Sequence, residues 1–95
     1  MKYRLIIQGE AEQEIIQAYL WYEEQQKDLG EVFFAALDHC FLYVSNNPKG
    51  SQRIYENYRQ CLVKRFPYAV IYEIKGADII IYSIFHTSRH PSNKP

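Results

Sequence analysis

The sequence predicts an α+β domain in which a small sheet is covered on one face by two helices. Three observations support this fold class. Apolar residues recur at helical spacing between residues 11 and 44. Three apolar, strand-like runs then follow one another between residues 58 and 86, separated by turn signals. The 95 residues are enough for one modest core, so we expect a single domain over residues 1–95, in the order β-α-α-β-β-β.

A short strand and a helical hairpin are expected in the first half of the chain. The strand covers Lys2–Gln8, where the side chains alternate, and Gly9 interrupts it. The first helix spans about Ala11–Gln26 and begins among acidic residues, which a helix N-terminus favours. Asp28 is a candidate cap for the second helix, which should end in the stop signal of residues 46–50. The apolar stripe of this second helix has helical periodicity and consists of Leu29, Val32, Phe33, Ala36, Leu37, Cys40, Phe41 and Val44.

Three strands of a small antiparallel sheet are expected in the second half, at Tyr58–Phe66, Tyr68–Lys75 and Asp78–His86. Pro67 separates the first two, because it has no N–H for the ladder, and Gly76 lies in the turn between the last two. One face of the middle strand is assigned to the core beneath the helices. Its residues are Tyr68, Val70, Tyr72 and Ile74.

The last predicted strand is apolar on both faces. One face carries Ile80, Tyr82 and Ile84, and the other carries Ile79, Ile81 and Phe85. Such a strand is expected at the centre of a sheet whose second face is covered by another protein or by a second copy of the chain. We therefore predict that Ile79, Ile81 and Phe85 bind a partner, and a homodimer would cover the same surface.

Charge is divided between the two halves of the chain, although the whole is neutral. Residues 1–48 carry three Lys or Arg and eight Asp or Glu, whereas residues 49–95 carry eight Lys or Arg and three Asp or Glu. Either the basic half binds an anionic partner, or the two halves attract each other. The predicted target-binding residues are the basic and imidazole side chains at the strand ends. They are Arg59, Lys64, Arg65, His86 and Arg89.

Most of these residues also have a structural interpretation. Arg59 could tie the loop between residues 48 and 57 to the sheet. Lys64 and Arg65 flank a turn, where they could simply be solvated. His86 ends a buried strand and could be a hydrogen-bonded structural residue. Arg89 is the better functional candidate, because binding residues are common in loops such as the one that follows this strand.

Composition excludes several other classes of protein. The apolar run of residues 79–85 is too short for a membrane span, and no signal segment precedes the first strand, so we expect a cytoplasmic protein without membrane partners. Cys40 and Cys61 lie in apolar patterns and are expected to be buried free thiols. Their spacing fits no metal site, and neither a metal nor a cofactor is predicted.

An ordered set of features resembles the RelE/ParE superfamily, the toxins of type II toxin–antitoxin pairs. After a first strand and a helical hairpin, the set continues with Asn47-Pro48, Arg59, Phe66-Pro67-Tyr68, Ile71-Tyr72 and His86-Thr-Ser-Arg89. The resemblance covers nearly the whole chain. It implies a small antiparallel sheet with two helices on one face. It also implies a bacterial growth inhibitor of the plasmid-stabilisation type that a cognate antitoxin neutralises.

The superfamily divides by activity. RelE-like toxins cut mRNA on the ribosome, and ParE-like toxins poison DNA gyrase. Cutting RNA without a metal needs a base, an acid and cations for the phosphate. RelE-like enzymes resemble one another in carrying several Lys or Arg on the sheet face, and often a Tyr or His near the C-terminus. Some of them have basic residues where this chain has Gln60, Leu62 and Ala69, and the tail of residues 90–95 contains no Tyr.

We therefore expect a ParE-like toxin that acts by binding, with no assigned catalytic residue. The alternative is a metal-independent, ribosome-dependent endoribonuclease that uses Arg65, His86 and Arg89. A third interpretation is an inactive family member that serves as a binding module. The target under these interpretations is DNA gyrase or the ribosome.

Overall fold

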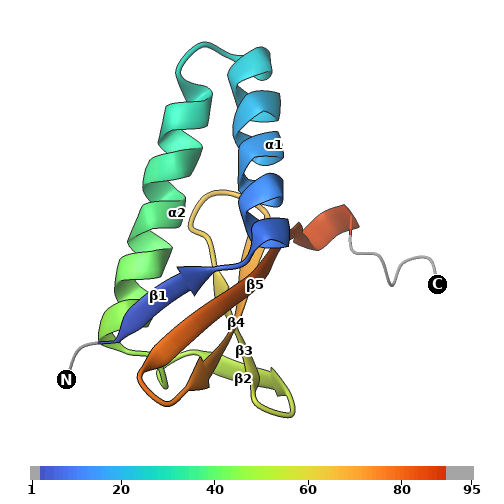
Figure 1. The fold of residues 1–95 in the computed structure, drawn as a ribbon. Helices are drawn as coiled ribbons and strands as arrows, with labels where there is room; N and C mark the ends of the chain where they lie inside the picture. Colours follow the sequence, from blue (N-terminus) through green and yellow to red (C-terminus); the bar gives the residue numbers. More distant parts are fainter. Residues whose placement is uncertain (1–2, 90–95) are drawn as a thin grey trace.

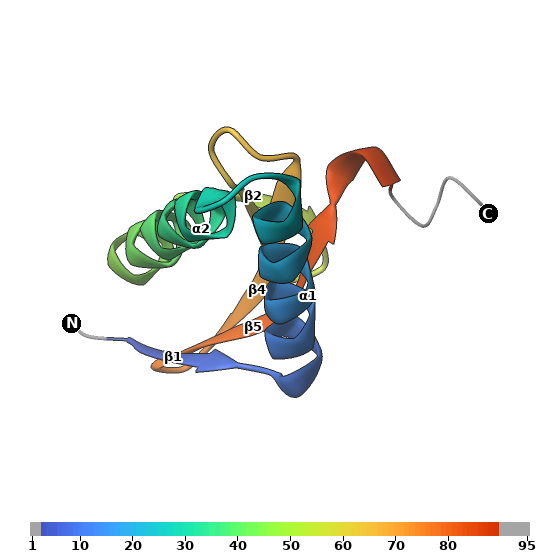
Figure 2. The same ribbon diagram turned by 90° about the horizontal axis from the view of Figure 1, so that it is seen from above.

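The computed structural model describes residues 3–89 and confirms the α+β fold class, with a helical hairpin packed against a sheet (Figure 1). The strands are β1 (Arg4–Ile7), β2 (Gln52–Tyr55), β3 (Tyr58–Leu62), β4 (Tyr68–Lys75) and β5 (Asp78–His86). The helices are α1 (Gly9–Gln25), α2 (Leu29–Asn46) and the short 3-10 helix η1 (Thr87–Arg89). Figure 2 shows α1 and α2 side by side. None of the helices in the described range combines the length and apolar character needed to cross a membrane.

The sheet has five strands in the order β1-β5-β4-β3-β2, so β5 is an interior strand with a neighbour on each side, next to the central strand β4. It is mixed rather than wholly antiparallel, because β1 runs parallel to β5 while all the other pairs are antiparallel. A parallel pair requires a long crossover. Both helices and three strands lie between β1 and β5 in the chain, which provides that crossover.

β2 lies where the sequence predicts only a loop, between residues 48 and 57. All four of its residues are exposed, and it pairs only with β3 at the edge of the sheet. The strand therefore buries no side chain and shows no apolar pattern in the sequence. Its pairing with β3 becomes visible only in the fold.

The turn between α1 and α2 is closed by Glu23 rather than by the predicted cap, Asp28. Asp28 adopts a left-handed conformation with φ 69° and makes no side-chain capping bond. The Glu23 carboxylate instead accepts hydrogen bonds from the backbone N–H groups of Asp28 and Gly30, each at 2.9 Å. A Cβ atom on Gly30 would come within 2.8 Å of the Tyr19 carbonyl oxygen, so the helices approach closely here. An acid from α1 thus provides the negative charge that the start of α2 favours.

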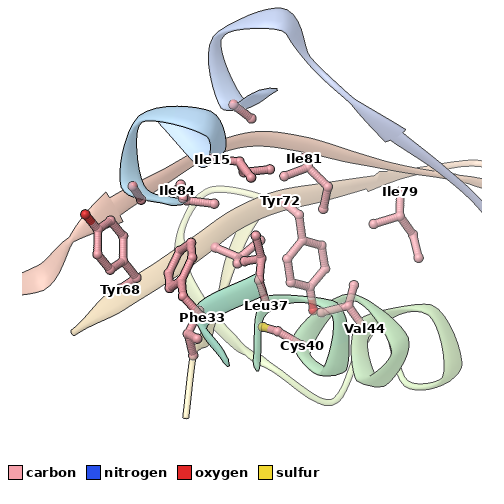
Figure 3. Packing of buried hydrophobic residues seen from close by; sticks show 14 of the residues in the cluster. Ile15, Phe33, Leu37, Cys40, Val44, Tyr68, Tyr72, Ile79, Ile81 and Ile84 are labelled. Carbon is pink, nitrogen blue, oxygen red and sulfur yellow. The ribbon is translucent and has the colours of Figure 1, made fainter. Parts of the chain in front are cut away.

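The core lies between the helices and the sheet (Figure 3). On β4, Tyr68, Val70 and Tyr72 are buried as predicted, and Ile74 packs against them. The hydroxyl of Tyr72 donates to the backbone oxygen of Pro48 at 2.7 Å, which satisfies a polar group in the interior. The α2 stripe contributes Phe33, Leu37, Cys40 and Val44, all buried.

A β-bulge in β5 changes which of its residues face the core. Ile71 pairs with Ser83, whereas the next residue, Tyr72, pairs with Ile81, which leaves Tyr82 as the extra residue. A bulge inserts one residue into one strand of a pair, so side chains before and after it exchange faces relative to strict alternation. The strict alternation assumed from the sequence therefore fails after Ile81.

The pairing of β5 with β4 overturns the predicted partner-binding face of β5, because Ile79 and Ile81 lie opposite Ile74 and Tyr72 on the helix side. Ile79 and Ile81 are fully buried beneath the helices, and Ile84 joins them in the core after the bulge. A partner cannot reach Ile79 or Ile81 on this chain, so that prediction is wrong. Phe85 is half-buried and pairs with Ala69 across the strands.

Helix α1 is attached to β5 by a carboxylate. β1 ends at Ile7, which pairs with Ile81, so within residues 3–89 the rest of β5 has no strand neighbour on that side. There an oxygen of Glu14 accepts hydrogen bonds from the Ile84 N–H and the Ser83 hydroxyl, both at 2.9 Å. Glu14 takes the place of a neighbouring strand and sets the position of α1 over the sheet.

Candidate binding site

One end of the sheet brings together most of the predicted target-binding residues. Tyr68 pairs with His86 there, and the N–H of Thr87 donates to the oxygen of Pro67 at 2.7 Å. The loop after β3 and the segment after β5 are thereby joined. Lys64, Arg65 and His86 lie at this end, and the backbone of Arg89 ends η1 beside it. The Arg89 side chain and the tail of residues 90–95 lie outside the described part of the chain.

Lys64 and Arg65 are presented to solvent by an anchored loop. Both side chains are exposed, and Arg65 adopts a positive φ of 74°. The next residue, Phe66, packs edge-on against Tyr22 and Phe33, with ring centroids 4.9 and 5.2 Å apart. The aromatic contacts hold the loop against the helices, so the backbone that carries the two cations is anchored there.

His86 is ordered by its surroundings. Its ring stands edge-on to Tyr68 with the centroids 5.1 Å apart, and its Nδ1 accepts from the Ser88 N–H at 3.2 Å. The interpretation as a hydrogen-bonded residue at a strand end is confirmed.

Arg59 does not belong to this group. It pairs with Tyr72, four residues further along β4 than Tyr68, which is about 13 Å at strand spacing. Its guanidinium donates to the backbone oxygens of Lys49 at 3.3 Å and Ser51 at 2.7 Å. The interpretation that Arg59 ties the loop before it to the sheet is confirmed.

We expect Arg59→Ala to lower the free energy of unfolding by about 1–3 kcal/mol, because it removes charged donors from two backbone oxygens. Arg53→Ala is the matched control: Arg53 is exposed on β2 opposite Arg59, and its loss should cost less than about 0.5 kcal/mol. Urea unfolding of both variants measures the difference. Equal, small losses would contradict the structural role of Arg59.

A groove with a volume of about 900 Å³ runs between α2 and β3, next to the Lys64–Arg65 loop. Several large apolar side chains in its lining are exposed to solvent. They are Val32 at 43%, Leu42 at 55%, Tyr43 at 46% and Leu62 at 63%. We call this surface the α2–β3 groove. It provides apolar area beside an exposed pair of cations.

The sequence interpretation missed this groove. Val32 was expected in the core stripe of the second helix, but it lies on the groove side of α2. Leu42 and Tyr43 are large apolar residues that fall outside the core stripe of the second helix. Their position off the stripe is the signal in the sequence that could have indicated an exposed apolar surface. Leu62 could not be assigned to an exposed face, because that required the register of β3 with β4.

A family match identifies the chain. Residues 5–91 match the family described as the ParE toxin of the type II toxin–antitoxin system parDE. The chain belongs to the ParE toxin family. This confirms the resemblance to the RelE/ParE superfamily and its ParE-like branch. No curated protein matches the sequence of this ParE-family chain at a significant level.

Chains of three toxin–antitoxin systems are among the solved structures that share the fold of this ParE-family chain. A chain of the chromosomal ParDE system from P. aeruginosa superposes with a TM-score of 0.78 and 17% identity, over 90% of this chain and 96% of that one. A chain of the E. coli DinJ-YafQ toxin–antitoxin complex superposes with a TM-score of 0.63 and 13% identity, over 94% of this chain and 97% of that one. A chain of the RelB-RelE antitoxin–toxin complex from Methanococcus jannaschii superposes with a TM-score of 0.58 and 17% identity, over 95% of this chain and 99% of that one.

Proposed function

We propose that this chain is the toxin of a type II toxin–antitoxin pair, and that it arrests growth by binding DNA gyrase in the bacterial cytoplasm. The match to the ParE toxin family over residues 5–91 carries this proposal. The likeness to a chain of a ParDE system supports the same branch. Inhibition by binding requires surface complementarity and no catalytic group.

Target binding is assigned to the sheet end that carries Lys64, Arg65, His86 and Arg89. Lys64 and Arg65 are exposed there on a loop that Phe66 anchors between the helices. Exposed cations on an anchored loop favour an anionic surface on the target. Arg59 is assigned to the structure of the β2–β3 edge and not to target binding.

The cognate antitoxin is assigned to the α2–β3 groove. The groove offers exposed apolar side chains, and His39, Lys64 and Arg65 belong to its lining. A helix or strand that inserts apolar residues and carries acids at its ends would complement it in shape and charge. An antitoxin bound there would also cover Lys64 and Arg65, which would block the proposed target surface.

Controlled expression tests the proposal. We expect induction of the chain alone to stop growth, and co-expression of the antitoxin encoded beside it to restore growth. The purified chain should inhibit supercoiling by gyrase in vitro, and the purified antitoxin should relieve the inhibition. Transcripts should stay intact during the arrest.

Two results would overturn this proposal. Unimpaired growth at confirmed soluble expression would exclude a toxin. Growth arrest with cleaved mRNA and unaffected supercoiling would exclude gyrase as the target, and it would favour the ribonuclease alternative. In that case His86→Ala should abolish the cleavage.

A further inference from the structure

The fold brings the two cysteines of the chain together. Cys40 lies on α2 and is buried, with 6% of its surface exposed, and Cys61 lies half-buried on β3. The Sγ atom of Cys40 is 3.7 Å from the carbonyl oxygen of Cys61, and both residues line the α2–β3 groove. Both are free thiols, as the sequence predicts. The chain contains only these two, so neither has another intramolecular cysteine partner.

The two thiol groups differ in acidity. A side-chain hydrogen bond from Cys40 stabilises the thiolate of Cys61 and lowers the pKa of Cys61 to about 7, against the opposing effect of burial. A hydrogen bond with Ser51 also lowers the pKa of Cys61. The same contact with Cys61, together with burial, raises the pKa of the Cys40 thiol. Cys61 is therefore the more acidic of the two thiols and the one that ionises first as the pH rises.

We propose that Cys40 and Cys61 are an oxidation site, at which a peroxide converts the two neighbouring thiols into a disulfide that joins α2 to β3. The Cys61 thiolate attacks one peroxide oxygen, the O–O bond breaks, and hydroxide leaves a sulfenic acid on Cys61. Cys40 then attacks the Cys61 sulfur, the S–O bond breaks, and its thiol proton leaves with the released oxygen. The two thiols are oxidised, and hydrogen peroxide is reduced to two molecules of water.

The position of the pair suits both steps. Cys61 is reached from the groove, which is open to solvent, whereas the buried Cys40 is screened from direct attack. The thiol of Cys40 lies against the residue whose sulfur it would attack, because its Sγ atom is 3.7 Å from the Cys61 carbonyl oxygen. The disulfide would link the two ends of the chain segment between residues 40 and 61, and this segment contains the loop held by Arg59. Toxin activity plays no part in this reaction.

The purified full-length chain tests the proposal with hydrogen peroxide as the probe. We expect both thiols to disappear together, with a monomer mass lower by two hydrogens and a non-reducing peptide map that links residues 40 and 61. The midpoint of thermal unfolding should rise by on the order of 10 °C, because the cross-link restricts the unfolded chain. Dithiothreitol should reverse both changes.

Single variants separate the two roles. Cys40→Ser should stop at a sulfenic acid on Cys61, which dimedone traps, and Cys61→Ser should leave Cys40 largely unmodified. Circular dichroism verifies that each variant folds, and the wild-type measurement needs no variant. Disulfide-linked dimers without an intramolecular bond, or oxidation of the two cysteines at unrelated rates to sulfonic acids, would overturn the proposal.

Alkylation by iodoacetamide tests which thiol attacks. The rate at Cys61 should rise with pH around a midpoint of about 7 in the wild type. In Cys40→Ala the donor to the thiolate is lost, so the midpoint should move up toward about 8.5. If the alkylation midpoint of Cys61 in the wild type is already about 8.5, the ordinary pKa of a cysteine, the assignment of Cys61 as the attacking thiolate is overturned.

Discussion

A chain that carries Lys64→Glu and Arg65→Glu together is expected to lose its ability to arrest growth. Both side chains are exposed on the loop that Phe66 anchors against the helices. Reversing the two charges replaces two attractions to an anionic target with two repulsions. Like charges that face each other across an interface cost several kcal/mol of binding free energy. We expect the concentration for half-inhibition of gyrase supercoiling to rise by about 100-fold or more. Viable counts after induction should approach those of an empty vector.

The matched control is the double reversal Lys49→Glu and Arg53→Glu. It changes the net charge of the chain by the same amount, at exposed positions in the segment between α2 and β3. Arg65 has a positive φ, but Arg and Glu are both L-residues with a Cβ, so the exchange leaves the backbone cost unchanged. This control should stay toxic. Full toxicity of the Lys64 and Arg65 variant at equal soluble expression would place the target surface elsewhere.

Replacement of the central aromatic residue, Phe33→Ala, is expected to lower the free energy of unfolding by about 3–5 kcal/mol. Phe33 has no exposed surface. Its ring stacks on Tyr22 at 5.2 Å and meets Phe66 and Tyr68 edge-on at 5.2 and 5.3 Å. The cavity left by its removal is surrounded by three other rings on different elements, so it cannot close without moving a helix or a strand. Urea unfolding measures the loss.

Phe34→Ala is the control for this prediction, because it removes the same side chain from the next position of α2. Phe34 is 51% exposed, and its ring lies 6.4 Å from that of Tyr19. We expect a loss below about 1 kcal/mol there. Similar losses in the two variants would show that the core is not organised around Phe33. The Phe33→Ala variant should also be less toxic. Phe66, which holds the loop of Lys64 and Arg65, loses one of its ring contacts when Phe33 is removed.

Some of the fold and of the site could be predicted because the signal is local. The helical period of the second helix identifies Phe33, Leu37 and Val44 as core residues, and all three are buried. Alternation along the middle strand assigns Tyr68 and Tyr72 to the helix side, where both are found. A side chain that must reach the core repeats with the period of its own element, so its position can be inferred from its neighbours in sequence.

Other features carry no local signal. β2 is held only by pairing with β3, so it has no apolar pattern to detect. Ile79 and Ile81 are buried because they pair with Ile74 and Tyr72 on the helix side of β4, and the bulge at Tyr82 then shifts the phase of β5 by one residue, so that Ile84 faces the core as well. The acid that closes the α1–α2 turn is Glu23, because the helices approach closely at Gly30.

The sequence by itself determined the two helices, the strands that contribute to the core, and the basic and imidazole side chains that lie at the strand ends. Only the tertiary structure decided which of these groups meet. It joins the loop of Lys64 to the end of β5 through Thr87 and Pro67, and it places Cys40 against Cys61. Periodicity reports the burial of a residue relative to its own element. Contacts between elements depend instead on register and packing, which the whole core determines together.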